Sequence, residues 1–245
     1  MSGAIDTMGS KKVLLVASNP ATSEQTGWPI GYWAAELTHP YWELTENGYE
    51  VDIASPEGGK LAVDSWSDPT DESGYSVDDL ISQGFLTMPK TRALVDNSLK
   101  LSDVNPDDYD AILLVGGQGP MYTFYKNQKL EKFFADFYET GKIAAAICHA
   151  TCILLHTRLS NGDLLVKGKT WTGFANSEED YADNFVGKPI QPFRIEDEAR
   201  KLDDTNFIVD GMFKAHVVRD GNLITGQQQH SGTAAARLII EALGK

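Results

Sequence analysis

Short continuous apolar runs alternate along the chain with longer segments of helical periodicity. Runs of this kind are typical of strands buried on both faces of a parallel sheet, and they occupy residues 12–18, 109–115 and 142–147. Residues 49–54 are also predicted to form a strand. Helical patterns cover residues 31–47, 128–140 and 231–243. The alternation predicts an α/β fold, an open sandwich around a mostly parallel sheet.

The second half of the chain carries shorter elements. We expect a helix to begin at His149, and the patterns predict further helices over residues 177–185 and 192–202 and strands over residues 169–174, 206–209, 215–218 and 223–225. Ser231 is expected to N-cap the last helix, and Gly244 to end it. In the first helix Pro40 predicts a kink or two short helices, because proline cannot donate the backbone hydrogen bond.

Residues 56–100 break the alternation. They are rich in Gly, Ser, Asp and Pro, and a structureless loop of this length is uncommon in a compact domain. We therefore expect short helices that form a cap, inserted into one α/β domain that spans residues 12–245. Residues 1–11 have no hydrophobic signal region and are expected to be a disordered leader, which favours a cytoplasmic location.

Composition and charge narrow the range of partners. The chain is 42% hydrophobic and 23% charged, as in ordinary soluble proteins. Its net charge of −14 argues against binding to nucleic acid or to an anionic membrane surface, whereas a small neutral substrate would be unaffected. The two cysteines, Cys148 and Cys152, do not have redox C-x-x-C spacing, and zinc-finger spacing is absent from the sequence. No cofactor and no metal are expected.

Cys148 is the first candidate for chemistry. It ends an apolar run and is followed directly by His149 and a predicted helix. A sharp strand-to-helix turn would lift its side chain above the sheet, as in a nucleophile elbow, and the helix N-terminus would lower the pKa of the thiol. The alternative is a small buried structural cysteine, which this stretch alone favours because free cysteines are commonly buried.

Three other stretches carry polar groups of interest. The glycine loop 116–120 follows a predicted strand, and its N–H groups could face an oxyanion or simply form a turn. Glu36 lies among apolar residues, which would raise its pKa, although a solvated helix glutamate is the simpler interpretation. Glu178 and Glu179 could orient a histidine or occupy the first turn of a helix.

Together these stretches resemble the ThiJ/PfpI superfamily, and within it the fungal and bacterial branch of heat-shock-type chaperones with glyoxalase III activity. The resemblance extends from about residue 12 to the end of the chain. Its motifs are A-x-E-x-x-H-P at 34–40, G-Y-E-V-D-I-A-S-P at 48–56, G-G-x-G at 116–119, A-x-C-H at 146–149, T-G-F with E-E in 172–179, and D-G-N-L-I-T-G-Q at 220–227.

The resemblance implies a flavodoxin-like three-layer sandwich with Cys148 as the nucleophile on the elbow. It implies that Glu36 is a protonated acid beside the sulfur and that His149 is the partner of the thiol. Glu179 is expected to orient His149, with Glu178 as the alternative alignment.

The resemblance further implies an oxyanion pocket formed by the backbone N–H groups of Gly117 and His149, in a substrate pocket with Gly116 and Gln118. The implied activity converts methylglyoxal and other 2-oxoaldehydes to lactate-type acids through a cysteine hemithioacetal, without glutathione, in stress protection. A homodimer is also implied. Relatives often have His where this chain has Gln118, and Gly where it has Ala150.

Other functions remain open. One is a cysteine amidase, peptidase or protein deglycase that uses the same Cys148. Another is a holdase chaperone for unfolded proteins, or a redox sensor, without turnover. Trp66, Tyr75 and Phe85 in the cap segment could supply an exposed apolar surface, although packing as lid core is favoured. A class I glutamine amidotransferase is disfavoured, because its downstream H-x-E triad is missing.

Overall fold

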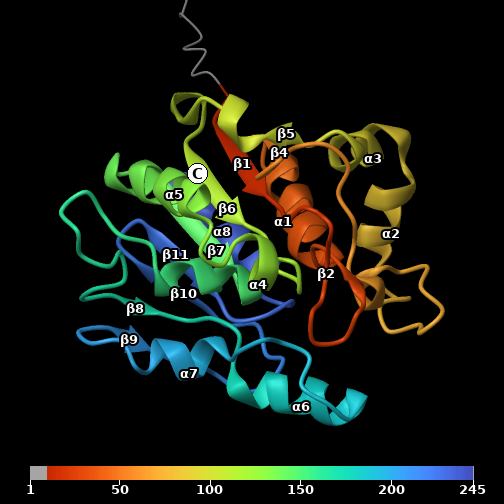
Figure 1. Cartoon of the computed structure of the whole chain (residues 1–245). Coiled ribbons are helices and arrows are strands. Elements are labelled where there is room, and N and C mark those ends of the chain that lie inside the picture. The colour runs from red at the N-terminus through yellow and green to blue at the C-terminus, as the bar shows by residue number, and fades with distance from the viewer. Residues whose placement is uncertain (1–9, 245) are drawn as a thin grey trace, which may run out of the picture.

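A seven-stranded sheet forms the centre of the molecule in the computed structural model, which describes residues 10–244. The strand order is β10-β11-β7-β6-β1-β4-β5, and every pair is parallel except β10 with β11 (Figure 1). The strands are β1 (Lys12–Val16), β4 (Glu50–Ser55), β5 (Leu99–Lys100), β6 (Ala111–Leu114), β7 (Ile143–Ile147), β10 (Val217–Asp220) and β11 (Leu223–Gly226). This arrangement confirms the mostly parallel α/β fold.

Helices cover both faces of the sheet and give three layers (Figure 1). Helices α1 (Ala34–Glu46) and α8 (Gly232–Leu243) pack on one face, where they share a core with Val13 and Leu15. Helix α5 (Gln128–Glu139), with the short helices α4 (Pro120–Thr123) and η4 (Cys148–Leu155), shares the opposite core with Leu14 and Val16. Because successive strand residues point to opposite faces, a continuous apolar run is what a sheet covered on both sides requires.

The structure corrects part of two local expectations about helices. The alternative of two short helices at Pro40 was wrong, because α1 continues through Pro40 as one helix. Pro40 lies against α8, where a Cβ on Gly232 would be only 3.2 Å from the proline ring. Tertiary packing therefore outweighs the lost hydrogen bond. Ser231 occupies the N-cap position of α8 as expected, but its side chain makes no capping hydrogen bond. Its hydroxyl oxygen instead accepts the N–H groups of His216 at 3.3 Å and Gln228 at 3.4 Å, and the hydroxyl donates to the His216 carbonyl at 3.1 Å.

Residues 56–100 contain the expected short helices: η1 (Ser65–Ser67), α2 (Leu80–Thr87) and α3 (Pro89–Asp96). The segment is anchored to α1 by a hydrogen bond between Ser82 and Thr38 at 2.7 Å, and Phe85 is buried against Tyr41. It returns to the central sheet as β5. The division into leader, domain and cap stays a prediction, and residues 1–9 of the leader lie outside the described residues.

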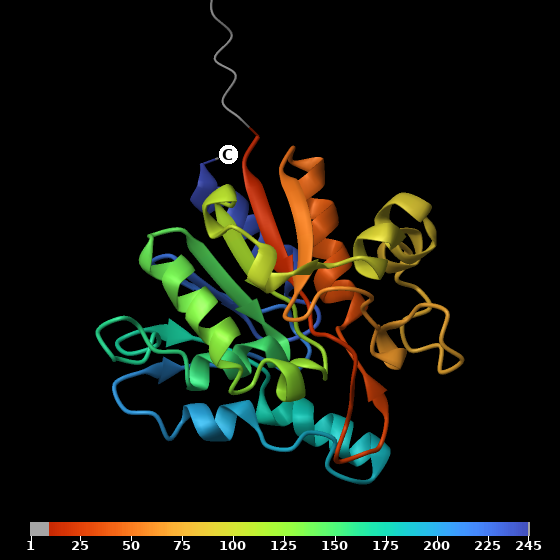
Figure 2. The same cartoon turned by 45° about the horizontal axis from the view of Figure 1, so that its top comes forward.

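The remaining elements lie around this framework. Helices α6 (Asn176–Val186) and α7 (Ile195–Ala199) lie beyond the carboxyl ends of the central strands (Figure 1, Figure 2). The predicted strands near 169–174 and 206–209 form β8 (Thr170–Trp171) and β9 (Asn206–Phe207), which pair in a small separate sheet. The others are β2 (Ala21–Thr22), β3 (Pro29–Ile30), η2 (Leu101–Asp103) and η3 (Pro106–Asp108). Within residues 10–244, no helix is long and apolar enough to cross a membrane.

Candidate active site

Cys148 stands at a sharp turn at the carboxyl end of β7. It is the first residue of η4, and its φ of 57° lies in the left-handed region that side chains rarely adopt. The neighbouring loop can lie this close to the turn because residue 116 is glycine. A Cβ on Gly116 would lie 2.6 Å from Cβ of Cys148, which is too close. The geometry is that of an elbow, which holds the side chain of Cys148 at the base of a pocket.

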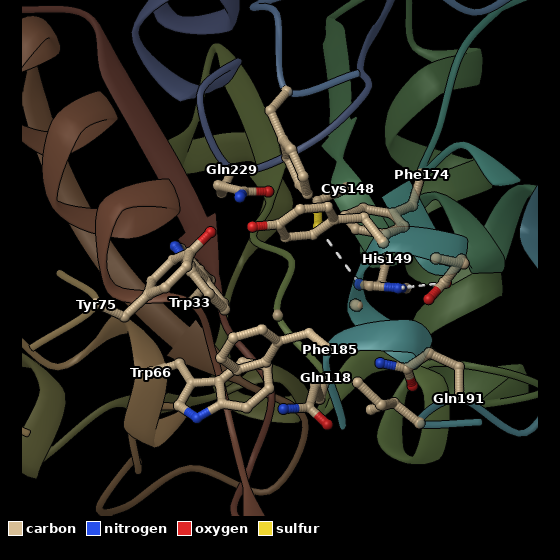
Figure 3. Close-up of a pocket in the computed structure, with 16 residues that line it drawn as sticks. Trp33, Trp66, Tyr75, Gln118, Cys148, His149, Phe174, Phe185, Gln191 and Gln229 are labelled. Atoms are coloured by element: carbon tan, nitrogen blue, oxygen red, sulfur yellow. Dashed lines mark hydrogen bonds and ion pairs between the residues drawn. The ribbon is translucent and has the colours of Figure 1, made fainter. Parts of the chain in front are cut away.

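His149 connects the thiol to a carboxylate. Its Nδ1 lies 3.4 Å from Sγ of Cys148, and its Nε2 lies 2.8 Å from Oε1 of Glu179 (Figure 3). Phe174 stacks on the imidazole with ring centroids 4.0 Å apart, which fixes the orientation of the ring. Glu178 points elsewhere and accepts hydrogen bonds from the Phe213 N–H and from the side chain of Gln227.

Burial opposes a positive charge on the imidazole of His149. The nearby Glu179 carboxylate and its hydrogen bond outweigh that effect, so the pKa of His149 is raised above its ordinary value of 6.5. The imidazolium form is thereby more favoured than in an ordinary histidine. A histidine in this state can donate a proton to a developing oxyanion and can take one back.

Glu36 reaches the sulfur from α1. Its side chain is 0% exposed, and its Oε2 accepts the Gly116 N–H at 2.8 Å. Burial raises the pKa of Glu36 from 4.5 to about 7, against the opposing effects of the Cys148 thiol and of His149. Its protonated and ionised forms are therefore both populated near neutrality, which suits a group that carries a proton.

The expectation of a lowered pKa for the Cys148 thiol was wrong. Burial and the negative charge of Glu36 raise the pKa of Cys148 well above its ordinary value, although the N–H groups of Gly117 and His149 act in the opposite direction. The helix N-terminus is present, but desolvation outweighs it. When Glu36 holds a proton its negative charge disappears, so ionisation of the thiol is coupled to protonation of Glu36.

Asp64 is a site residue that sequence reasoning missed. It lies in the cap segment, is 1% exposed, and accepts the N–H of Gly31 at 2.8 Å and that of Gln118 at 2.6 Å. Burial raises the pKa of Asp64 to about 6, opposed by these two hydrogen bonds. Asp64 thus fixes the glycine loop whose N–H groups face the sulfur. In the sequence it is one of several aspartates in a polar segment, and no local signal marks it.

A cavity of about 170 Å³ opens above Cys148 (Figure 3). Gly117, Gln118, His149 and Glu179 line it, whereas Gly116 packs behind the thiol. Aromatic side chains form most of its wall: Trp33, Trp66, Tyr75, Phe174, Tyr181, Phe185 and Phe213.

The aromatic residues expected to pack as lid core behave differently from one another. Phe85 is buried, as expected. Tyr75 is 51% exposed at the cavity rim, where it adjoins Trp66. Within residues 10–244, His, Cys, Asp and Glu side chains form no group of three or more that could hold a metal ion.

Comparison with known proteins agrees with this geometry. The sequence model of the DJ-1/PfpI family matches residues 31–242. The chain belongs to the DJ-1/PfpI family. The membership predicted from the sequence motifs is thereby confirmed, and the elbow of this family member lies inside the matched region.

Two curated relatives of this DJ-1/PfpI protein align over almost the whole chain. Glyoxalase 3 of Candida albicans is 27% identical, over 95% of this chain and 98% of its own. The glutathione-independent glyoxalase of Saccharomyces cerevisiae is 28% identical, over 96% and 99%.

Solved structures extend the likeness to three dimensions. Glyoxalase III from Candida albicans superimposes with a TM-score of 0.77 at 26% identity, over 96% of this chain and 98% of that one. The Rapid Encystment Protein of Francisella tularensis superimposes with a TM-score of 0.84 at 28% identity, over 96% and 100%.

Proposed function

We propose that this protein is a glutathione-independent glyoxalase, which converts 2-oxoaldehydes such as methylglyoxal to 2-hydroxy acids without a cofactor. The observation that carries the proposal is the meeting of three groups around one sulfur. The Cys148 thiol and the imidazole of His149, held by Glu179, line the base of the cavity, and the Glu36 carboxyl with a pKa near 7 lies directly behind the thiol. The names of the aligned relatives support the same reaction.

The first step forms a bond between Sγ of Cys148 and the aldehyde carbon C1. The thiol proton moves to the Glu36 carboxylate as the sulfur attacks, and the C=O electron pair becomes an oxyanion. The N–H groups of Gly117 and His149, which already face the sulfur, stabilise that oxyanion. Protonation of the oxyanion gives a hemithioacetal.

The second step moves a proton from C1 to C2. Glu36 or His149 takes the C1 proton, the electron pair forms an enediol, and reprotonation at C2 leaves a thioester at C1. C1 is oxidised while C2 is reduced, so no external oxidant or reductant is needed. Water then cleaves the S–C1 bond, which releases the 2-hydroxy acid and restores the thiol.

The test is lactate formation from methylglyoxal in the absence of glutathione. We expect activity in the wild type and in Cys152→Ala, and none above background in Cys148→Ala. Cys152 is a matched control, because it is equally buried and one turn further along η4. An inactive wild type, or full activity of Cys148→Ala, would falsify the proposal.

A second candidate function is holdase action on unfolded proteins. Large apolar side chains are exposed on the cap segment, and exposed apolar surface is what such binding requires; they include Tyr75, Val77, Leu80, Ile81 and Met88. Aggregation of a heated client protein measures this activity. Protection that persists in Cys148→Ala would show that it is separate from catalysis, and absence of protection in the wild type would exclude it.

Three expectations stay predictions within this proposal. The first is a homodimer, which light scattering of the purified protein tests. The second is a cytoplasmic location, which microscopy of a tagged protein tests. The third is deglycase action through Cys148, which some relatives' names suggest, among them Deglycase PfpI of Pyrococcus furiosus at 33% identity over 56% of this chain.

A further inference from the structure

The lining of the cavity above Cys148 is larger than a three-carbon substrate could contact. Seven of its lining side chains are aromatic, and they come from segments far apart in the sequence. Trp66 and Tyr75 belong to the cap, Tyr181 and Phe185 to α6, and Phe213 to the approach to β10. A substrate the size of methylglyoxal would contact Cys148 and its neighbours but would leave most of these rings uncovered.

Two aromatic walls approach one another across the mouth of the cavity. Trp66 of the cap meets Phe185 of α6 edge-to-face, with ring centroids 5.7 Å apart and planes at 84° (Figure 3). Phe185 is nevertheless 72% exposed. A planar apolar group laid against this pair, on the cavity side, would gain edge-to-face or offset contacts with both rings and would cover part of the exposed surface of Phe185.

The charges of the wall select against anions. Among the lining residues, all of which are described, none is Lys or Arg, and Glu179 is the one carboxylate. Asp64 and Glu36 lie directly behind the glycine loop. The remaining polar side-chain groups include the neutral amides of Gln118, Gln191 and Gln229. The imidazole of His149 also lines the cavity, but it is already paired with the Glu179 carboxylate at 2.8 Å and offers no free positive charge. A negatively charged substituent would enter without a counter-charge, so its desolvation would be unfavourable.

We propose that the preferred substrates are uncharged 2-oxoaldehydes with a large apolar or aryl group on C2, of the phenylglyoxal type. The inference rests on the proposed glyoxalase function. The reaction is the same: Cys148 attacks the aldehyde carbon, the aryl ketone carbon is reduced to a carbinol, and water releases a mandelate-type acid. The walls formed by Trp66 and Phe185 hold the aryl group.

The test compares kcat/KM for methylglyoxal, phenylglyoxal and 4-carboxyphenylglyoxal, with the 2-hydroxy acid product quantified directly. We expect phenylglyoxal to exceed both other substrates by about tenfold or more, because an additional buried ring gains apolar contact. Phe185→Ala should lower the ratio of phenylglyoxal to methylglyoxal by about tenfold. Trp42→Ala is the matched control, because Trp42 is also an exposed aromatic residue, 53% exposed, and lies outside this cavity, and it should leave the ratio unchanged.

The possible outcomes separate the two proposals. Turnover of methylglyoxal with a kcat/KM equal to or above that for phenylglyoxal overturns the aryl preference and leaves the glyoxalase function standing. Absence of turnover with all three compounds overturns the glyoxalase function. Calorimetry with Cys148→Ala then decides the ligand class: binding of 2-hydroxyacetophenone about tenfold tighter than hydroxyacetone supports an aryl site, and equal or absent binding refutes it.

Discussion

Replacing Glu36 by Gln tests the electrostatics of the site through protein stability. Glu36 is fully buried, and its Oε2 accepts the Gly116 N–H. Glutamine has nearly the same volume and keeps an oxygen that can accept this hydrogen bond, but it cannot ionise. We therefore expect Glu36→Gln to remove a pH-dependent contribution to the free energy of unfolding while preserving the local packing.

The sign and size follow from the pKa of Glu36. It is about 7 in the folded protein against an ordinary value of 4.5, so between these values the folded state keeps a proton that the unfolded chain has released. Stability from the protonated carboxyl is fully present below pH 4.5 and is lost as the pH rises through 7. The difference corresponds to about 3 kcal/mol in the free energy of unfolding.

Urea unfolding at pH 5 and pH 8 measures this effect. Relative to wild type, Glu36→Gln should gain about 2.5 kcal/mol between the two pH values, and the comparison cancels the titrating groups that do not interact with Glu36. Glu46→Gln is the matched control, because Glu46 is exposed in the same helix, and it should show no comparable change. A gain that does not depend on pH, or one with the opposite sign, would refute the reasoning.

Three further substitutions test the geometry. Glu179→Gln should lower the pKa of His149, because burial remains while the carboxylate charge is lost; kcat should fall by about 10- to 100-fold, and an unmoved acid limb in the pH–rate profile contradicts this. Gly116→Ala would place a Cβ 2.3 Å from Oε2 of Glu36 and should abolish activity. Gly84→Ala in α2 is the control, because the new Cβ would meet no atom within 4 Å. It should leave activity unchanged and the melting temperature unchanged or higher. Asp64→Asn would turn an amide N–H₂ toward the N–H of either Gly31 or Gln118, so one hydrogen bond would be lost. The protein should be destabilised by about 1–3 kcal/mol and kcat should fall. An unchanged kcat would show that the glycine loop keeps its conformation without the carboxylate.

The sheet was predictable because its signals are local. Strands β1, β6 and β7 are continuous or nearly continuous apolar runs. Gly141 and Gly244 each lie close to the end of the helix before them. The turn at Cys148 left a local signal, since strand end, Cys148 and following helix are contiguous in the sequence. That stretch alone favoured a buried structural cysteine, and the elbow was predicted only from its combination with Glu36, the glycine loop and the Glu178-Glu179 pair. Pro40 and Ser231 were misjudged because contacts made elsewhere in the chain, with Gly232 and with His216, decide their roles.

The electrostatics of the site could not be derived from local sequence. Whether the pKa of Cys148 rises or falls depends on Glu36, which is more than a hundred residues away, and on how completely both are buried. Asp64 acts through backbone N–H groups of Gly31 and Gln118, which leave no trace in the sequence. The aromatic wall likewise assembles from separate segments, so no single motif contains it.

The left-handed backbone conformation at Cys148 lowers the stability of the fold at the residue that carries the reactive thiol. Any residue with a Cβ that adopts this conformation costs about 1 kcal/mol or more relative to glycine. A variant with glycine at 148 would fold with less strain but would lack the nucleophile. A chain released from the chemistry would therefore gain stability with glycine at this turn, so the presence of a side chain at position 148 is a cost that only reactivity explains.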